Sequence, residues 1–394
     1  FEAFYQLEWD KTVIDGCGTY FSTADVAATG CNVVTLTGLA SDQVNMLGGL
    51  YITRQPDLEP DDDGQWGVAL RYFAERLAGS EFGVYYMNYH SRVPYLSGVA
   101  SSNPLVPSAA IPPGFPDPLP VFIPLDNGQD LGALLGGGNP EYYVEFPEDI
   151  ELYGLSFATN LAGFAVSGEV SHRPDFPVQI NTTELLQGAV GLAPWSTVTP
   201  IILTNGFGEA APGYDLLPVT QAQVTFIRFF DQVLGASRLS FAAEIGANWV
   251  GDLPEQSVQR YGRSPTYGMG AFTPIPLAAL GIPLDGNLTC EGFFPPPPLD
   301  QVIDPIVPNT NPVNCTNDGY VTDSSWGYRV RASLTYNDVF AGVNLTPRFA
   351  WSHDVDGYSP NSNFNEGAKA LSLGVTAEYL NRYTAAFDFT AFSG

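Results

Sequence analysis

Three histidines are the residues of this chain best suited to acid–base chemistry. His90, His172 and His353 each lie near the end of a predicted strand and are far apart in sequence. Ser352 and Asp354 flank His353, but a catalytic triad is defined by positions in space, so adjacency in sequence is weak support. The chain has no G-x-S-x-G nucleophile elbow. A hydrolase would need a serine and a histidine within hydrogen-bond reach, and we rank that hypothesis last and expect no catalytic residues.

Acidic residues are the next candidates, because carboxylates are cation ligands. The segment Asp354 to Gly357 is typical of a turn and lacks the distal ligands of an EF-hand. The run Asp61 to Asp63 is predicted to be a solvated loop tip. A divalent cation held by these carboxylates is the alternative. We expect no metal and no cofactor.

Charged residues inside predicted strands could contact a solute. Of 15 basic residues, 13 are arginine. In a β-barrel that spans a membrane, a charged side chain that faces lipid at mid-bilayer costs about 2 to 4 kcal/mol. If the predicted strands form such a barrel, these side chains are expected to face its lumen. They either brace the lumen as an arginine–carboxylate network or form a polar constriction that contacts a permeating solute. The expected lumen-lining residues are Arg71, Glu169, Arg173, Arg238, Glu244, Arg329, Arg331, Arg348, Glu378 and Asp388.

Apolar residues in the predicted loops are a second candidate site. Segments expected to lie in water are rich in large apolar side chains, and exposed apolar patches mark binding surfaces. Either the loops pack on one another as a plug or lid with a small core, or they form a mouth that collects hydrophobic molecules. The candidate loop-binding residues are Phe115, Phe122, Ile123, Phe293 and Phe294.

The four cysteines fall as two pairs that are local in sequence, Cys17 with Cys31 and Cys290 with Cys315. They lack the C-x-x-C spacing of a zinc or redox site, and the local pairing is one of the connectivities that four cysteines allow. Two loop disulfides are the expected arrangement. They imply an oxidising compartment such as the periplasm or the cell surface.

A recurring unit of strand, short turn, strand and long loop would position these residues. From Trp66 to Phe73, apolar and small or polar residues alternate with period two, which indicates a strand. The predicted strands are 3–9, 66–73, 82–90, 152–159, 164–172, 224–230, 239–250, 328–336, 343–351, 371–379 and 383–389. The long loops are predicted at about 12–62, 94–148, 174–221, 251–325 and 353–367.

This pattern predicts an all-β fold, a transmembrane antiparallel β-barrel with short periplasmic turns and long extracellular loops. Apolar runs are too short for a membrane helix, and tyrosine and tryptophan recur near strand ends, as an interfacial girdle requires. Residues 1–394 are read as one barrel domain with about eleven strands visible. Because bacterial barrels have even strand numbers, we expect missing terminal portions and 14 or more strands in the full chain.

Three blocks of sequence resemble one protein family. They are FYQLEW from Phe4 with CGTYFSTAD from Cys17, GQWGVALRY from Gly64, and the stretch from Leu345 to Gly367. They resemble a proteobacterial family of uncharacterised outer-membrane proteins, domain of unknown function thirteen-oh-two. The resemblance implies a Gram-negative outer-membrane protein and supplies no catalytic or ligand residues. The chain is also distantly similar to the long-chain fatty-acid transporters of that membrane, chiefly through its Thr346-Pro347-Arg348 strand.

The leading functional hypothesis is a porin-like channel or transporter for the uptake of hydrophobic or amphipathic small molecules. The alternative is a structural or partner-binding protein whose loops dock another protein or another copy of the chain. Expected partners are outer-membrane lipid or lipopolysaccharide and a hydrophobic ligand. The net charge of −27 argues against nucleic acid, because a phosphate-binding surface needs a basic stripe.

Overall fold

The computed structural model describes the chain except residues 21–24, 36–40, 48–50, 78, 102–139, 191–195, 207, 265–266, 269, 277, 279–284, 295–314 and 381. Its main feature is an 11-stranded sheet in which every neighbouring pair is antiparallel. In order across the sheet, the strands are β1 (Glu2–Tyr5), β4 (Trp66–Ala74), β5 (Ser80–Tyr89), β8 (Ile150–Leu161), β9 (Phe164–Gln179), β11 (Tyr214–Asp231), β12 (Arg238–Val250), β16 (Ser324–Phe340), β17 (Val343–Asp356), β18 (Lys369–Tyr379) and β19 (Tyr383–Ser393).

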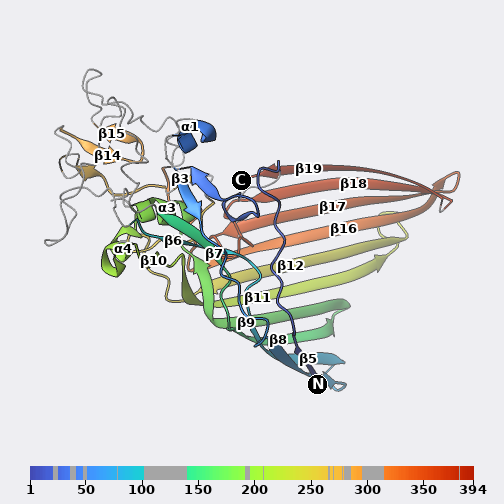
Figure 1. Ribbon diagram of the computed structural model, residues 1–394. Helices are drawn as coiled ribbons and strands as arrows, with labels where there is room; N and C mark the ends of the chain where they lie inside the picture. Colours follow the sequence, from blue (N-terminus) through green and yellow to red (C-terminus); the bar gives the residue numbers. More distant parts are fainter. Residues whose placement is uncertain are drawn as a thin grey trace.

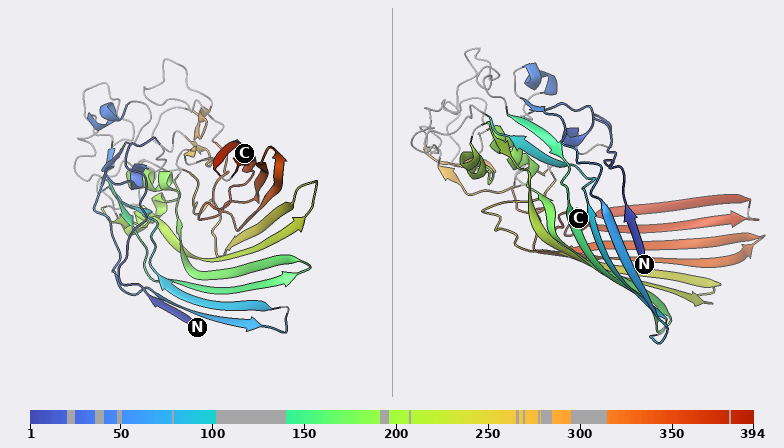
Figure 2. Two further views of the ribbon diagram at one scale, coloured as in Figure 1. Left: turned by 90° about the vertical axis from the view of Figure 1, so that its right-hand side faces the viewer. Right: turned by 60° about the horizontal axis from the view of Figure 1, so that its bottom comes forward.

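Each predicted strand corresponds to one strand of this sheet, so the all-β prediction is confirmed. The sheet curves into an open trough, with β1 at one edge and β19 at the other (Figures 1 and 2). The two edge strands do not pair with each other among the described residues, so the expected closed barrel is not found. Within the same described ranges, no helix combines the length and apolarity needed to cross a membrane.

Short turns join the strands at one end of the sheet, as expected. Ala162 and Gly163 link β8 to β9, and Ala341 and Gly342 link β16 to β17, all with positive φ. Two consecutive left-handed residues match the right-handed twist of a hairpin, which is why each turn carries glycine. The β16–β17 turn was predicted over 337–342; β16 in fact continues to Phe340.

Two strands run further than the sequence pattern predicts. β9 and β11 keep pairing until Gln179 lies opposite Tyr214, inside the predicted loop 174–221. Proline interrupts the alternation here, and Pro218 sits at a register shift between Leu217 and Val219, where a lost backbone donor is tolerated. The extensions carry the ladder into the loop region.

The long loops form a second folded layer at the other end of the sheet, here called the cap (Figure 1). Segments from three loops build a five-stranded sheet, in which β3 and β7 are parallel. Its order is β10 (Ala210–Ala211), β6 (Tyr95–Val99), β7 (Glu141–Glu145), β3 (Tyr51–Arg54) and β2 (Val33–Thr35). The other elements are η1 (Asp25–Ala27), α1 (Asp42–Leu47), α3 (Thr182–Val190), α4 (Thr199–Asn205), β13 (Ile275–Pro276), β14 (Asn287–Thr289) and β15 (Gly292–Phe294).

The cap has a hydrophobic core of its own. Ile52, Tyr142 and Leu185 are fully buried there, and the core extends to Val219 and Val250 at the ends of β11 and β12. Both predicted disulfides, Cys17–Cys31 and Cys290–Cys315, are confirmed and lie in the loops. The loops thus pack on one another around a small core, which was one of the two arrangements predicted from the sequence.

Candidate functional site on the polar face of the sheet

Strand register divides the large sheet into a polar and an apolar face. Directly paired residues share a face, as do alternate residues along a strand. Arg71 pairs with Gly83, Gly83 with Ser156, and Ser156 with Glu169, so Arg71 and Glu169 lie on the same face. The same reasoning, strand by strand, places all ten expected lumen-lining residues on this polar face.

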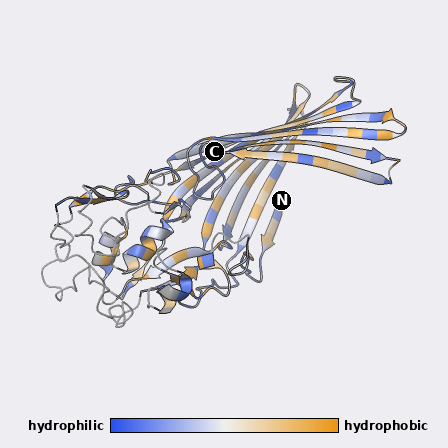
Figure 3. Cartoon of the chain, turned by 90° about the horizontal axis from the view of Figure 1, so that it is seen from above, coloured by the Kyte–Doolittle hydropathy of each residue, from blue (hydrophilic) through white to orange (hydrophobic). Residues whose placement is uncertain are grey.

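The opposite face carries large apolar side chains that none of the described segments covers. Figure 3 shows hydrophobic and hydrophilic residues alternating along the strands. Exposed members of this apolar face are Leu70, Tyr72, Val84, Tyr153, Leu155, Val170, Ile245, Trp249, Trp326, Phe349, Leu373, Val375, Phe387 and Phe389. At the loop end of the strands, Trp351 donates a hydrogen bond through Nε1 to the Tyr328 hydroxyl at 3.2 Å. Exposed apolar surface of this extent marks an interaction surface.

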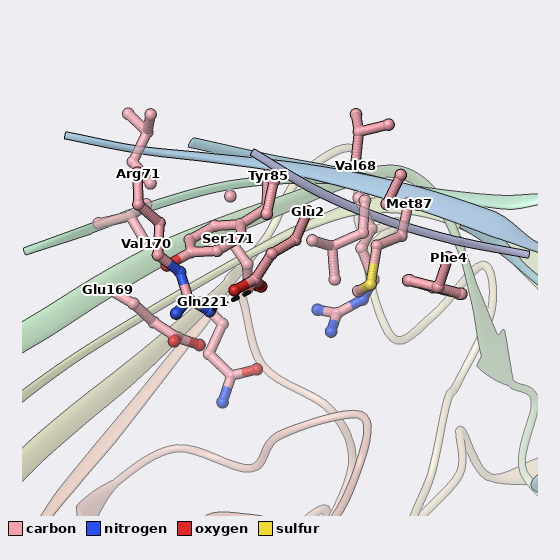
Figure 4. A pocket seen from close by; sticks show the side chains of 17 residues that line it. Glu2, Phe4, Val68, Arg71, Tyr85, Met87, Glu169, Val170, Ser171 and Gln221 are labelled. Atoms are coloured by element: carbon pink, nitrogen blue, oxygen red, sulfur yellow. Dashed lines mark ion pairs between the residues drawn. The ribbon is translucent and has the colours of Figure 1, made fainter. Parts of the chain in front are cut away.

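The first hollow on the polar face has a volume of about 690 Å³ and is lined by β1, β4, β5, β8, β9 and β11. In Figure 4 the Arg71 guanidinium and the Glu2 carboxylate form an ion pair, 3.4 Å apart. Arg173 donates to the Tyr89 hydroxyl at 3.0 Å. Glu169 also lines this hollow, so its arginines and glutamates balance in charge.

Glycines shape this hollow by letting an aromatic ring lie flat on the sheet. The Tyr85 ring lies across Gly83 and Gly154, and its hydroxyl is 2.5 Å from the Ser156 hydroxyl. A Cβ on Gly83 would stand 2.7 Å from Tyr85 Cζ, and one on Gly154 would stand 3.2 Å from Tyr85 Cδ2. Glycine at both positions therefore fixes how far Tyr85 projects into the hollow.

The second hollow, of about 450 Å³, lies across the trough between β11 and β19. Arg348 donates to both carboxylate oxygens of Asp388, at 2.8 and 3.0 Å. Gly374 lies between them in register, and its Cβ would collide with the Asp388 carboxylate. Arg331 also lines this hollow, and no hydrogen-bond or ion-pair partner for it occurs in the described part of the chain.

The other predicted lumen residues form separate contacts rather than one network. Arg238 lies 3.5 Å from the Asp231 carboxylate, and Arg329 lies 3.6 Å from that of Asp354. Glu244 accepts a hydrogen bond from the Thr225 hydroxyl at 3.0 Å. Within the described residues, Arg348 and Asp388 are the one pair of predicted residues that bond to each other. The polar face therefore keeps several charges available to solvent.

The histidines have structural surroundings. The Asp149 backbone N–H donates to His90 Nδ1 at 3.0 Å, which assigns the ring hydrogen to Nε2, 2.8 Å from the Asp63 carbonyl oxygen. His172 Nδ1 lies 2.9 Å from the Thr220 hydroxyl. His353 lies against the rings of Tyr328 and Trp351. Across the ranges that the structure describes, no histidine hydrogen-bonds to a serine hydroxyl.

Residues of the acidic run Asp61 to Asp63 form hydrogen bonds with other segments of the chain. The Trp9 backbone N–H donates to Asp62 Oδ1 at 2.8 Å, and the Asp61 N–H donates to Glu148 Oε1 at 2.9 Å. No group of three or more His, Cys, Asp or Glu side chains among the described residues is arranged to hold a metal ion.

The candidate loop-binding residues are only partly described. Phe115, Phe122 and Ile123 lie outside the described residues. Phe293 and Phe294 belong by their backbone to β15, which pairs with β14, and their side chains also lie outside the description.

Sequence reasoning missed the buried ion pair that joins two loops of the cap. Glu184 on α3 is fully buried, and its Oε1 lies 2.5 Å from Nε of Arg260, which is 4% exposed. The Thr197 N–H and hydroxyl donate to the other carboxylate oxygen at 2.9 and 2.8 Å. The Arg260 guanidinium stacks 5.2 Å from the Tyr320 ring. No local sequence signal links residues so far apart.

A second missed contact brings a loop residue onto the polar face. Phe364 is buried, and Cβ atoms on Gly246 and Gly327 would lie 3.1 and 3.0 Å from its ring. The Arg329 guanidinium lies 5.9 Å from the same ring. The sequence signal for this contact was a pair of glycines, Gly246 on β12 and Gly327 on β16, which lie directly opposite each other.

Burial within the cap shifts the pKa of one carboxyl group. Burial raises the pKa of Glu145 on β7, and a hydrogen bond from the Ser97 hydroxyl partly opposes this. Burial, together with the Glu145 charge, raises the pKa of Tyr214 to about 12.

These features define a class: an all-β protein with a large curved sheet, one exposed apolar face, one polar face and a disulfide-tied cap. The chain belongs to the family described as "Protein of unknown function (DUF1302)", whose model matches residues 1–394. The predicted family resemblance is thereby confirmed, whereas the similarity to fatty-acid transporters is not shown. No curated protein and no solved structure matches the chain.

Proposed function

We propose that this chain belongs to a bacterial outer-membrane β-barrel that takes up hydrophobic or amphipathic small molecules. The observation that carries the proposal is the division of the 11-stranded sheet into an exposed apolar face and a polar face with open charges. In water, such an apolar face would be a large unfavourable surface. In a bilayer it becomes the lipid-facing wall, and the polar face becomes the lumen.

The height of the apolar band fits this placement. On β12 it runs from Leu239 to Trp249, ten residue steps that span about 34 Å along the strand at roughly 3.4 Å per residue. A tilt of about 45° reduces this to about 24 Å, close to the roughly 25 Å band of outer-membrane barrels. Closure requires the edges of β1 and β19, which do not pair with each other among the described residues, to find partners in the membrane.

The trough supports passage of amphipathic rather than purely polar solutes. Its two hollows combine arginine and carboxylate groups with apolar side chains such as Met87, Ile227 and Phe229. The cap covers the long-loop end, which the proposal places outside the cell. A solute would pass the cap and then move along the polar face.

The test is permeation through vesicles that contain the complete protein. We expect 4-phenylbutyrate and 4-phenylbutanol to enter faster than glucose, relative to protein-free vesicles. Gln221→Trp, on the polar face, should slow entry, whereas Val84→Trp, on the apolar face, should not. Equal rates with and without protein would overturn the uptake function. Recovery of the protein in the soluble fraction of cells would overturn its placement in a membrane.

The partner-binding alternative has one observation in its favour. The cap is a folded layer with its own core and sheet, which gives it a defined surface for docking. A stoichiometric complex that survives purification and protects cap loops from proteolysis would support it. Wild-type permeation by the isolated protein would favour uptake.

A further inference from the structure

We propose that the second hollow is a binding site for an anionic amphipath, with the carboxylate on Arg331 and the apolar part against Ile227 and Phe229. The inference deepens the proposed uptake function and rests on it for the route by which the ligand arrives. The site itself is defined by residues of β11, β12, β16, β17, β18 and β19.

Arg331 provides the charge. Its guanidinium lies on the polar face and is exposed, and the described residues offer it no carboxylate. Neighbouring Arg329 is paired with Asp354, and Arg348 is paired with Asp388. A planar guanidinium with free donors matches a carboxylate in a two-point contact.

The walls beside Arg331 are unusual for the polar face. Ile227 and Phe229 lie on this face by register, and Phe229 is 61% exposed. Ala242 and Ala350 flank Arg331 directly on the neighbouring strands and leave room around it. Apolar surface next to one unpaired cation suits a ligand with a charged end and an apolar body. The volume of about 450 Å³ falls within the range of small-molecule sites.

The Arg348–Asp388 pair limits how strongly the site attracts anions. With Arg331, it leaves the hollow one net positive charge, whereas the whole chain carries −27. Gly374 keeps the pair intact, because it lets the Asp388 carboxylate cross β18 to reach Arg348. Removing the Asp388 charge would free a second guanidinium for the ligand.

Binding to the complete, detergent-solubilised protein tests the site without requiring transport. The probe is 4-phenylbutyrate at neutral pH, measured by isothermal titration calorimetry, with the uncharged 4-phenylbutanamide as the matched control ligand. Arg331→Gln should weaken 4-phenylbutyrate binding about tenfold or more, because a charge-assisted hydrogen bond is lost. Asp388→Asn and Gly374→Ala should both strengthen it several-fold. Arg76→Gln, in the turn between β4 and β5 and outside both hollows, should leave the affinity unchanged.

The outcomes separate the site from the uptake function. Wild-type binding in Arg331→Gln, or equal binding of acid and amide, overturns the site whatever the vesicles show. Binding that follows the expected pattern without permeation upholds the site and overturns uptake. A circular-dichroism spectrum and thermal unfolding that match wild type show that the variants are folded.

Discussion

Exchanging a leucine on the exposed apolar face for arginine is the sharpest test of the two-faced sheet. Leu373 lies in the middle of β18 on the apolar face, opposite Phe349 on β17 and Phe389 on β19, and is 47% exposed. Thr376 lies three residues further on the polar face, opposite Thr346 and Ala386. The two sites share one strand and differ in the face that they occupy.

The expected cost depends on what covers the apolar face. Leu373 is 47% exposed and Thr376 is partly exposed, so in water each substitution should change the free energy of unfolding by only about 0.5 kcal/mol. In a bilayer, arginine at position 373 should cost about 2 to 4 kcal/mol, a factor of about 30 to 700 in the folding equilibrium. Arginine at position 376 faces the polar side near Glu378 and Asp388 and should cost little.

The assay is guanidinium titration of the complete protein in phosphatidylcholine vesicles, followed by fluorescence of its 6 tryptophans. Leu373→Arg should lower the unfolding midpoint strongly, and Thr376→Arg should leave it near wild type. Equal midpoints for the two variants would refute the assignment of the apolar face to lipid. An effect of Thr376→Arg larger than that of Leu373→Arg would reverse the faces.

Three further outcomes follow from cap and trough contacts. Glu184→Gln should destabilise the cap by about 3 to 5 kcal/mol, because it leaves Arg260 buried without its partner charge, and limited proteolysis of the loops should show it. Since burial raises the folded-state pKa of Glu145, its contribution to stability is full below the ordinary value of 4.5 and is lost as pH rises through the raised pKa. Glu145→Gln should therefore melt higher than wild type at pH 8, with the difference shrinking at pH 4. Gly83→Ala should push Tyr85 off the sheet at a cost of about 1 to 3 kcal/mol, measured as a lower guanidinium midpoint, and an unchanged midpoint would contradict the flat-ring packing.

The sequence predicted the large sheet well because the signal was local. In β18, period-two alternation alone assigned Leu371, Leu373 and Val375 to one face and Glu378 to the other, and register agrees. The turn predicted over 160–163 is found at Ala162 and Gly163, where glycine supplies the required backbone conformation. Face assignment needs no knowledge of distant segments, and register puts the ten charged residues on one shared face of the sheet, whereas their role in a lumen stays a prediction.

The cap escaped prediction because its contacts are not local. β3 pairs with β7 in parallel across a long loop, and Glu184 pairs with Arg260 across another. Nothing in either segment specifies its partner. Proline in β9 also concealed the last part of the β9–β11 ladder, where burial against the cap replaces the alternating pattern.

The scarcity of basic residues makes the position of each arginine informative. The chain has 15 basic and 42 acidic residues. In the cap, Arg54 and Arg263 direct their donors at loop carbonyls, among them those of Ala28 and Thr316, so they hold loops together. Arg331 has no such role among the described contacts, and it stands where a solute on the polar face would meet it.

Salt should weaken the long-range repulsion between the negatively charged protein and an anion more than it weakens the short-range attraction of that anion to Arg331. The charge of −27 repels an anion at long range, and ionic strength screens this repulsion beyond about 10 Å at 0.1 M. Contact with Arg331 acts at shorter range and is screened less. Raising salt from about 0.02 to 0.2 M should therefore speed 4-phenylbutyrate association several-fold in stopped-flow measurements, with a smaller change in dissociation. Slower association at higher salt would mean that net attraction guides the anion, and that the acidic loops lie away from its route.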